Sequence, residues 1–100
     1  MGRGTTKTHT FELPFDSQKI QSLRVVYKQN GRIVFKKAGD DIQIDGNVVT
    51  VKLSQEDTFA FSSDSVVEIQ LRVLLTNGDA KNSDIIKTSV AQCLDDEVIE

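Results

Sequence analysis

The chain contains few of the residues that cross-link or catalyse in small proteins. Its 100 residues include one cysteine, one histidine, one proline and no tryptophan. A lone cysteine excludes an intrachain disulfide, so the protein must be held by its core, which is typical of intracellular folding. No apolar run approaches the roughly 18 residues of a membrane span. Residues 1–9 also lack the apolar stretch of a signal peptide, so we expect synthesis in the cytoplasm without signal-directed secretion.

The chain also lacks a large excess of either positive or negative charge. Twelve basic and fifteen acidic side chains give a formal net charge of -3. Nucleic acids and anionic membranes attract proteins through a broad positive field, which this balance does not supply. An apolar content of 38% with mixed charges is typical of one folded domain. We therefore expect protein partners, including copies of the chain itself, and no nucleic acid, membrane or small-molecule ligand.

Apolar and polar residues alternate along most of the chain, and turn residues interrupt the alternation. This period of two predicts antiparallel strands. They are expected over residues 8–13, 20–29, 32–37, 42–44, 49–53, 66–75 and 80–94. Asn30 and Gly31 favour a type I′ hairpin turn between the second and third strands. The pattern predicts an all-β fold, an antiparallel two-sheet sandwich of immunoglobulin-like architecture with about seven strands.

One segment favours a helix instead. Ser54 can cap a helix whose first turn carries two acids, so we expect a short helical turn near residues 55–61. Phe59 or Phe61 would then enter the core. Its centre is expected on the strand at 66–75, where Leu71 lies in the middle of five alternating apolar residues. We divide the chain into a flexible leader at 1–7, the β-sandwich domain at 8–94 and an acidic C-terminal tail at 95–100.

The tail contains an apolar pair, Val98 and Ile99, directly after three acids. Leaving such side chains in water forgoes roughly 1.5–3 kcal/mol each compared with burial. The pair is therefore a candidate partner contact. It could fold back onto its own sheet or reach a neighbouring copy, where an unpaired edge strand would receive it. We favour the neighbouring copy.

The residues capable of chemistry are more simply explained by structure. His9 lies in a polar leader, so we expect it to be solvated. Cys93 lies in an apolar strand pattern, where a lone cysteine behaves as a small hydrophobic residue. Residues 41–46 match the first half of a calcium loop, but Lys52 occupies the position of the bidentate acid. The sequence thus indicates no catalytic residue, no cofactor and no metal site, and we expect no enzyme.

A carbohydrate-binding module is the alternative. Sugar sites commonly stack rings on exposed aromatic side chains. The chain has one Tyr and five Phe, most of which are needed in the core. Tyr27 is expected to be half exposed, with its ring packed and its hydroxyl wet.

Five segments carry a family resemblance. They are residues 8–16, 26–31, 53–58, 68–73 and 94–98. Together they resemble small uncharacterised proteins encoded in phage and prophage tail modules of Gram-positive bacteria. The opening segment is also similar to the N-terminal domain of phage baseplate upper proteins. The resemblance implies a structural or protein-interaction role in a virion tail or baseplate, without an activity.

Overall fold

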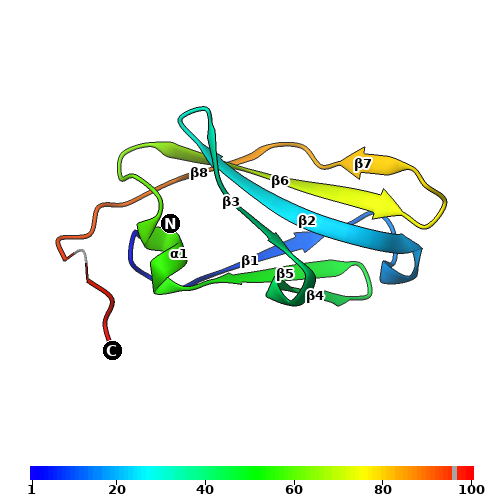
Figure 1. Ribbon diagram of the computed structural model, residues 1–100, viewed down its shortest axis with the longest axis horizontal. Helices are drawn as coiled ribbons and strands as arrows, with labels where there is room; N and C mark the ends of the chain where they lie inside the picture. Colours follow the sequence, from blue (N-terminus) through cyan, green and yellow to red (C-terminus); the bar gives the residue numbers. More distant parts are fainter. Residues whose placement is uncertain (96) are drawn as a thin grey trace.

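Two antiparallel sheets face each other in the computed structural model, which describes residues 1–95 and 97–100 (Figure 1). One sheet has the strand order β1-β5-β4, and the other has the order β3-β2-β6-β7, with β8 also paired to β6. The all-β sandwich is thereby confirmed. The strands are β1 (Lys7–Glu12), β2 (Ile20–Gln29), β3 (Arg32–Ala38), β4 (Ile42–Asp45), β5 (Val48–Leu53), β6 (Val66–Leu75), β7 (Ala80–Asn82) and β8 (Ile86–Ser89). The short helices are η1 (Ser17–Lys19), η2 (Gly39–Asp41) and α1 (Gln55–Phe59).

The two longest strands, β2 and β6, form the middle of the larger sheet. They pair over nearly their full length, with Val25 opposite Leu71. Alternate residues of both strands point to the smaller sheet and are buried, because a strand presents every second side chain to the same face. Leu71 is 1% exposed, so its predicted place at the centre of the core is confirmed.

Two local predictions are confirmed by the backbone. Asn30 and Gly31 both have positive φ, 54° and 77°, as a type I′ turn requires. The Ser54 hydroxyl accepts a hydrogen bond from the Asp57 N–H at the start of α1, and the Asp57 carboxylate accepts one from the Ser54 N–H. This capping box satisfies two backbone N–H groups at the helix start. Of the two candidate phenylalanines, Phe61, just beyond α1, is the one buried in the core, at 1% exposed.

The strand predicted over residues 80–94 is broken, which gives eight strands among the described residues instead of about seven. β7 and β8 pair with different halves of β6. Ser83 joins the halves, because its hydroxyl accepts a hydrogen bond from the Leu71 N–H and its own N–H donates to the Leu71 carbonyl, both at 2.9 Å. Cys93 lies beyond β8 and outside any strand, which corrects its predicted position.

The first residues, predicted as a flexible leader, lie against the end of the sandwich beside α1 (Figure 1). The Met1 ammonium donates to the Ser89 carbonyl at 2.8 Å, and Gly2 forms a parallel bridge with Ala91. The Arg3 guanidinium donates to the carbonyl oxygens of two residues around the C-terminal end of α1. A free leader does not account for these contacts.

Gly4 has a specific reason to be glycine at this end of the molecule. Its φ is +81°, and a Cβ there would lie 2.6 Å from Cζ of Phe59. Only glycine therefore fits without a shift of the ring. None of the described helices is long and apolar enough to span a membrane.

Candidate functional site

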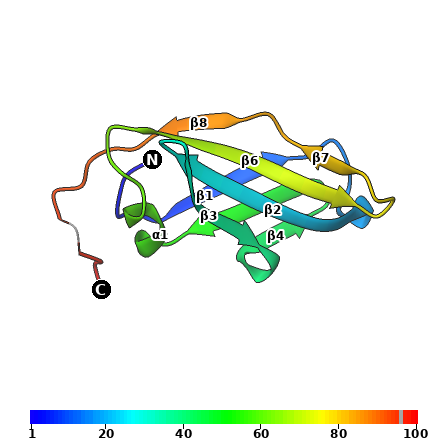
Figure 2. The ribbon, with the colours of Figure 1, turned by 45° about the horizontal axis from the view of Figure 1, so that its top comes forward.

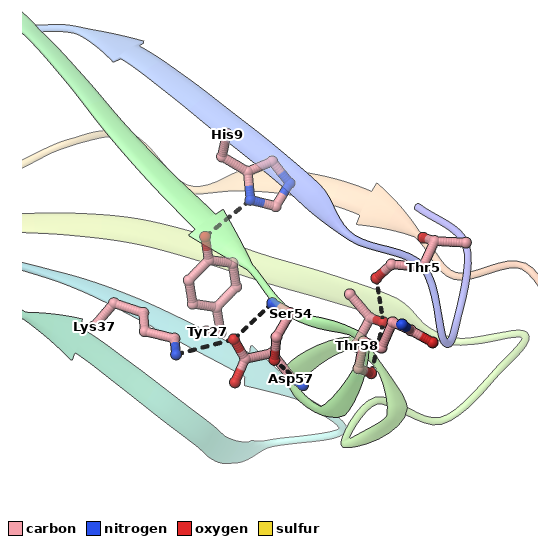
Figure 3. Close-up of polar contacts among 8 residues, drawn as sticks. Thr5, His9, Tyr27, Lys37, Ser54, Asp57 and Thr58 are labelled. Atoms are coloured by element: carbon pink, nitrogen blue, oxygen red, sulfur yellow. Dashed lines mark hydrogen bonds and ion pairs between the residues drawn. The ribbon is translucent and has the colours of Figure 1, made fainter. Parts of the chain in front are cut away.

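A polar cluster lies between the two sheets (Figure 3). His9 of β1 and Tyr27 of β2 face each other, with 2.9 Å between His9 Nδ1 and the Tyr27 hydroxyl. The Tyr27 ring packs on Phe35 and Phe61, at centroid distances of 4.9 and 6.0 Å. Two expectations are therefore wrong: Tyr27 is fully buried rather than half exposed, and His9 is partly buried rather than solvated. The sheet pairing places them together, because β1 lies in the facing sheet.

A second pair of side chains extends this cluster toward α1. Lys37 Nζ lies 3.0 Å from Asp57 Oδ2, and Asp57 also accepts a hydrogen bond from the Ser54 N–H at 2.9 Å. Partial burial by itself would raise the pKa of Asp57. The Ser54 N–H, together with Lys37, more than offsets it and holds this pKa below its usual value. Asp57 is thus a charged helix cap that also joins α1 to β3.

The chemistry of the His9 and Tyr27 pair is that of two neutral groups. Burial lowers the pKa of His9, and the positive charges of Lys7 and the N-terminus lower it further. Burial also raises the pKa of Tyr27, and the negative charge of Asp57 adds to this effect. A neutral imidazole and a protonated phenol remain at pH 7. They make a hydrogen bond that links the two sheets.

Other predicted residues lie apart from this cluster. The Cys93 thiol is partly exposed and lies 2.9 Å from the Asp95 carbonyl. In the part of the chain that the structure describes, no three His, Cys, Asp or Glu side chains gather closely enough to hold a metal ion. All six aromatic rings are buried or partly buried, so none offers a fully open stacking surface.

A groove of about 550 Å³ opens between the sheets beside the first residues of β2, which β3 does not reach. β3 pairs with β2 only from Arg24 onward, and the chain then turns through η2 and enters β4 in the other sheet. Residues 20–23 of β2 pair with β6 on one side alone. Their other side pairs with no strand and lines the groove, and the Ile20 N–H there donates to the Ser17 carbonyl.

The groove combines an apolar floor with positive charge. Ile42 and Ile44 of β4 lie opposite the buried Val51 and Val49, so they point inward toward it. Ile44 is nevertheless 39% exposed, because no strand covers it. We call this site the β2–β4 groove.

Two arginines are the charged residues among the described lining of the β2–β4 groove. Arg24 and Arg72 are directly opposite each other on β2 and β6, and no carboxylate joins them there. The Arg72 Nε donates to Asn82 Oδ1 at 3.1 Å. Within residues 1–95 and 97–100, the Arg24 side chain makes no hydrogen bond or ion pair. Like charges facing across a strand pair repel, so this pair favours an anionic partner.

The predicted contact residues lie at the far end of the molecule from the β2–β4 groove. Val98 and Ile99 are 40% and 76% exposed. The Ile99 N–H donates to Gln55 Oε1 at 2.8 Å, and Gln55 Nε2 donates to the Ile99 carbonyl at 2.9 Å. The C-terminus therefore lies near α1, whereas the start of β2 lies at the opposite end (Figures 1 and 2). Asp96 of the predicted tail lies outside the described residues.

Sequence reasoning identified the tail but not the groove. The groove exists because β3 is shorter than β2 and because the chain changes sheets at η2, and neither fact is written in the pattern of β2 itself. Comparison of the chain with protein-family models, with curated proteins and with solved structures finds no match.

Proposed function

We propose that this chain is a non-catalytic structural or protein-interaction domain of a phage or prophage tail or baseplate, and that its partners include copies of itself. The observation that supports this role is the exposed apolar C-terminal segment. Leu94 is 99% exposed and Ile99 is 76% exposed, although the chain has only a modest apolar content to bury. Apolar side chains held in water around a folded domain are typical of a contact with another protein.

The sheet edges add to this support. Ile85 and Ile86, at the start of edge strand β8, are 53% and 43% exposed. An edge strand with exposed apolar side chains favours pairing with a second chain. In a particle built from repeated copies, such edges would be covered.

The proposal is tested in two ways. Light scattering on the purified protein should show a mass that rises above 11.1 kDa with concentration. Mass spectrometry of purified particles from the encoding phage or prophage should detect the chain at many copies per particle. A non-structural protein of the same phage serves as the control and should be absent. A protein that stays monomeric at every concentration and is missing from the particles would overturn the proposal.

A further inference from the structure

We propose that residues 94–100 of one copy bind in the β2–β4 groove of the next copy and add a short strand to the free edge at residues 20–23. This inference rests on the proposed function and specifies its contact. The groove supplies both requirements of strand addition, namely unpaired backbone along β2 and apolar side chains below it.

Charge complementarity identifies the occupant. Four of the last six residues are acids, whereas the charged side chains among the described lining of the groove are Arg24 and Arg72. In a chain with more acids than bases, a groove that gathers arginines without a carboxylate is matched to an acidic segment. Carboxylates of the tail would meet the two arginines on the outer face of the sheet. They would relieve the repulsion between Arg24 and Arg72.

The apolar pair supplies the inward contact. Successive residues of an added strand point to opposite faces, so one of Val98 and Ile99 enters the groove. We assign Ile99 to the floor formed by Ile42 and Ile44. Its side chain has the most surface to bury, and the neighbouring Glu100 then points outward to the side of Arg24.

The shape of the molecule makes the contact intermolecular. Seven residues span at most about 25 Å when fully extended, and the molecule is 47 Å long. The tail leaves near α1, whereas the start of β2 lies at the opposite end (Figures 1 and 2). Residues at the start of β2 line the groove. Each copy thus presents a tail at one end and a groove toward the other. Such a head-to-tail contact builds a ring or a filament rather than a closed pair.

Gln55 competes with this contact. Its amide makes two hydrogen bonds to the Ile99 backbone, the same groups that an added strand would pair with β2. Binding to the next copy must therefore release Ile99 from Gln55. Replacing Gln55 with Ala should strengthen association about two- to fivefold, because the tail is freed without any change in the groove.

The decisive experiment uses two full-length variants, one with a blocked groove and one with a blocked tail. R24E/R72E reverses the charge of the groove, and I99D places a charge on the side chain that would enter the apolar floor. Sedimentation and light scattering should show that each variant alone associates at least about tenfold more weakly than wild type. K28E/K36E changes the same charge on β2 and β3 away from the groove lining and should associate like wild type.

Mixing the two variants gives a result that misfolding does not produce. The intact tail of R24E/R72E fits the intact groove of I99D. The two surfaces that remain are an acidic groove and a tail that is also acidic, which repel each other, so neither can bind further. The mixture should therefore form a dimer of about twice 11.1 kDa and stop there. As single substitutions in the wild-type chain, Ile99→Ser should weaken association more than Val98→Ser, because Ile99 is the side chain that enters the groove.

The outcomes separate the two proposals. If wild type associates and both R24E/R72E and I99D associate equally well, the docking inference fails while the proposed function stands. The same holds if wild type is monomeric in solution but present in particles. Growth of the mixture beyond a dimer, or a failure of the variants to combine, also overturns the docking.

Discussion

At the scale of single residues, the fold depends on polar side chains that are satisfied inside the sandwich. Tyr27 is fully buried, yet its hydroxyl has a partner in His9 at 2.9 Å. Gln29 is 5% exposed, and its amide makes hydrogen bonds at 2.8 Å with both the carbonyl and the N–H of Ser62. A buried polar group that loses its partner costs about 1–3 kcal/mol. These residues consequently fix which strands and turns meet.

The depressed pKa of His9 predicts a stability that falls in mild acid. Its folded pKa lies below the unfolded value of about 6.5, so the unfolded state binds the proton more readily. The contribution is complete above about pH 6.5 and is lost as the pH falls through the folded pKa. Urea melts at about pH 7.5 and about pH 5 should show a lower free energy of unfolding at the acidic pH.

The His9→Gln variant isolates this effect. Glutamine keeps a polar partner for the Tyr27 hydroxyl but does not titrate, so the loss between those two pH values should shrink. The chain has a single histidine. Asp57 has a pKa below its usual value, so its protonation lowers stability only at a more acidic pH than the two compared here. An equal loss in H9Q and wild type would show that the histidine is not the source.

The two faces of β6 predict opposite costs for neighbouring substitutions. Leu71→Ala should lower the free energy of unfolding by about 2–5 kcal/mol, because it leaves a cavity at the centre of the core. Gln70 is partly exposed and donates one hydrogen bond to the Ser83 carbonyl at 3.0 Å. Gln70→Ala should therefore cost about 1 kcal/mol or less. Denaturant melts that rank the two in reverse would contradict the assigned faces.

At the scale of elements, the interrupted edge beside β6 depends on one side chain. Ser83 restores the hydrogen bonds of the Leu71 backbone where β7 and β8 separate. Ser83→Ala should destabilise the protein by about 1–3 kcal/mol, because a part-buried N–H loses its acceptor. Ser89→Ala is the matched control on β8 and should change stability by less than about 0.5 kcal/mol. Equal melting curves for both variants would show that water replaces the hydroxyl.

The same elements show what sequence could and could not predict. β2 begins and ends where the alternation predicted, because nine of its residues pair with β6 and Asn30 and Gly31 fix the turn. The break at Ser83 escaped prediction, since its side chain replaces a strand pairing that alternation alone does not encode. The His9 and Tyr27 contact escaped for a related reason, because it joins strands of different sheets.

The candidate site likewise has one part that the sequence predicts and one part that it does not. Val98 and Ile99 were visible as an apolar pair among acids. The β2–β4 groove was not, because it depends on the strand that β2 lacks beside residues 20–23. The local sequence pattern predicts that a segment forms a strand, but the strands that pair with it depend on the whole fold.

At the scale of the whole molecule, the proposed contact predicts sensitivity to salt. Carboxylates and arginines that meet at an exposed groove are screened as the Debye length falls from about 14 Å at about 0.05 M salt to about 4 Å at about 0.5 M. Sedimentation in NaCl should show association that weakens over this range. K28E/K36E should retain this dependence, and R24E/R72E should lose it. Association that strengthens with salt would instead indicate a contact dominated by apolar surface.

The topology also constrains the order in which the strands can pair during synthesis. β1 belongs to the smaller sheet only through β5, whose first residue follows the end of β1 by 36 positions. The hairpin of β4 and β5 closes over two residues, so it can form as soon as it is synthesised. β1 has to wait for it, which at about 5–20 residues per second means several seconds on the ribosome. During that interval the strand that carries His9 has no sheet to join, and the last pairing of the smaller sheet is made by the earliest of its three strands to be synthesised.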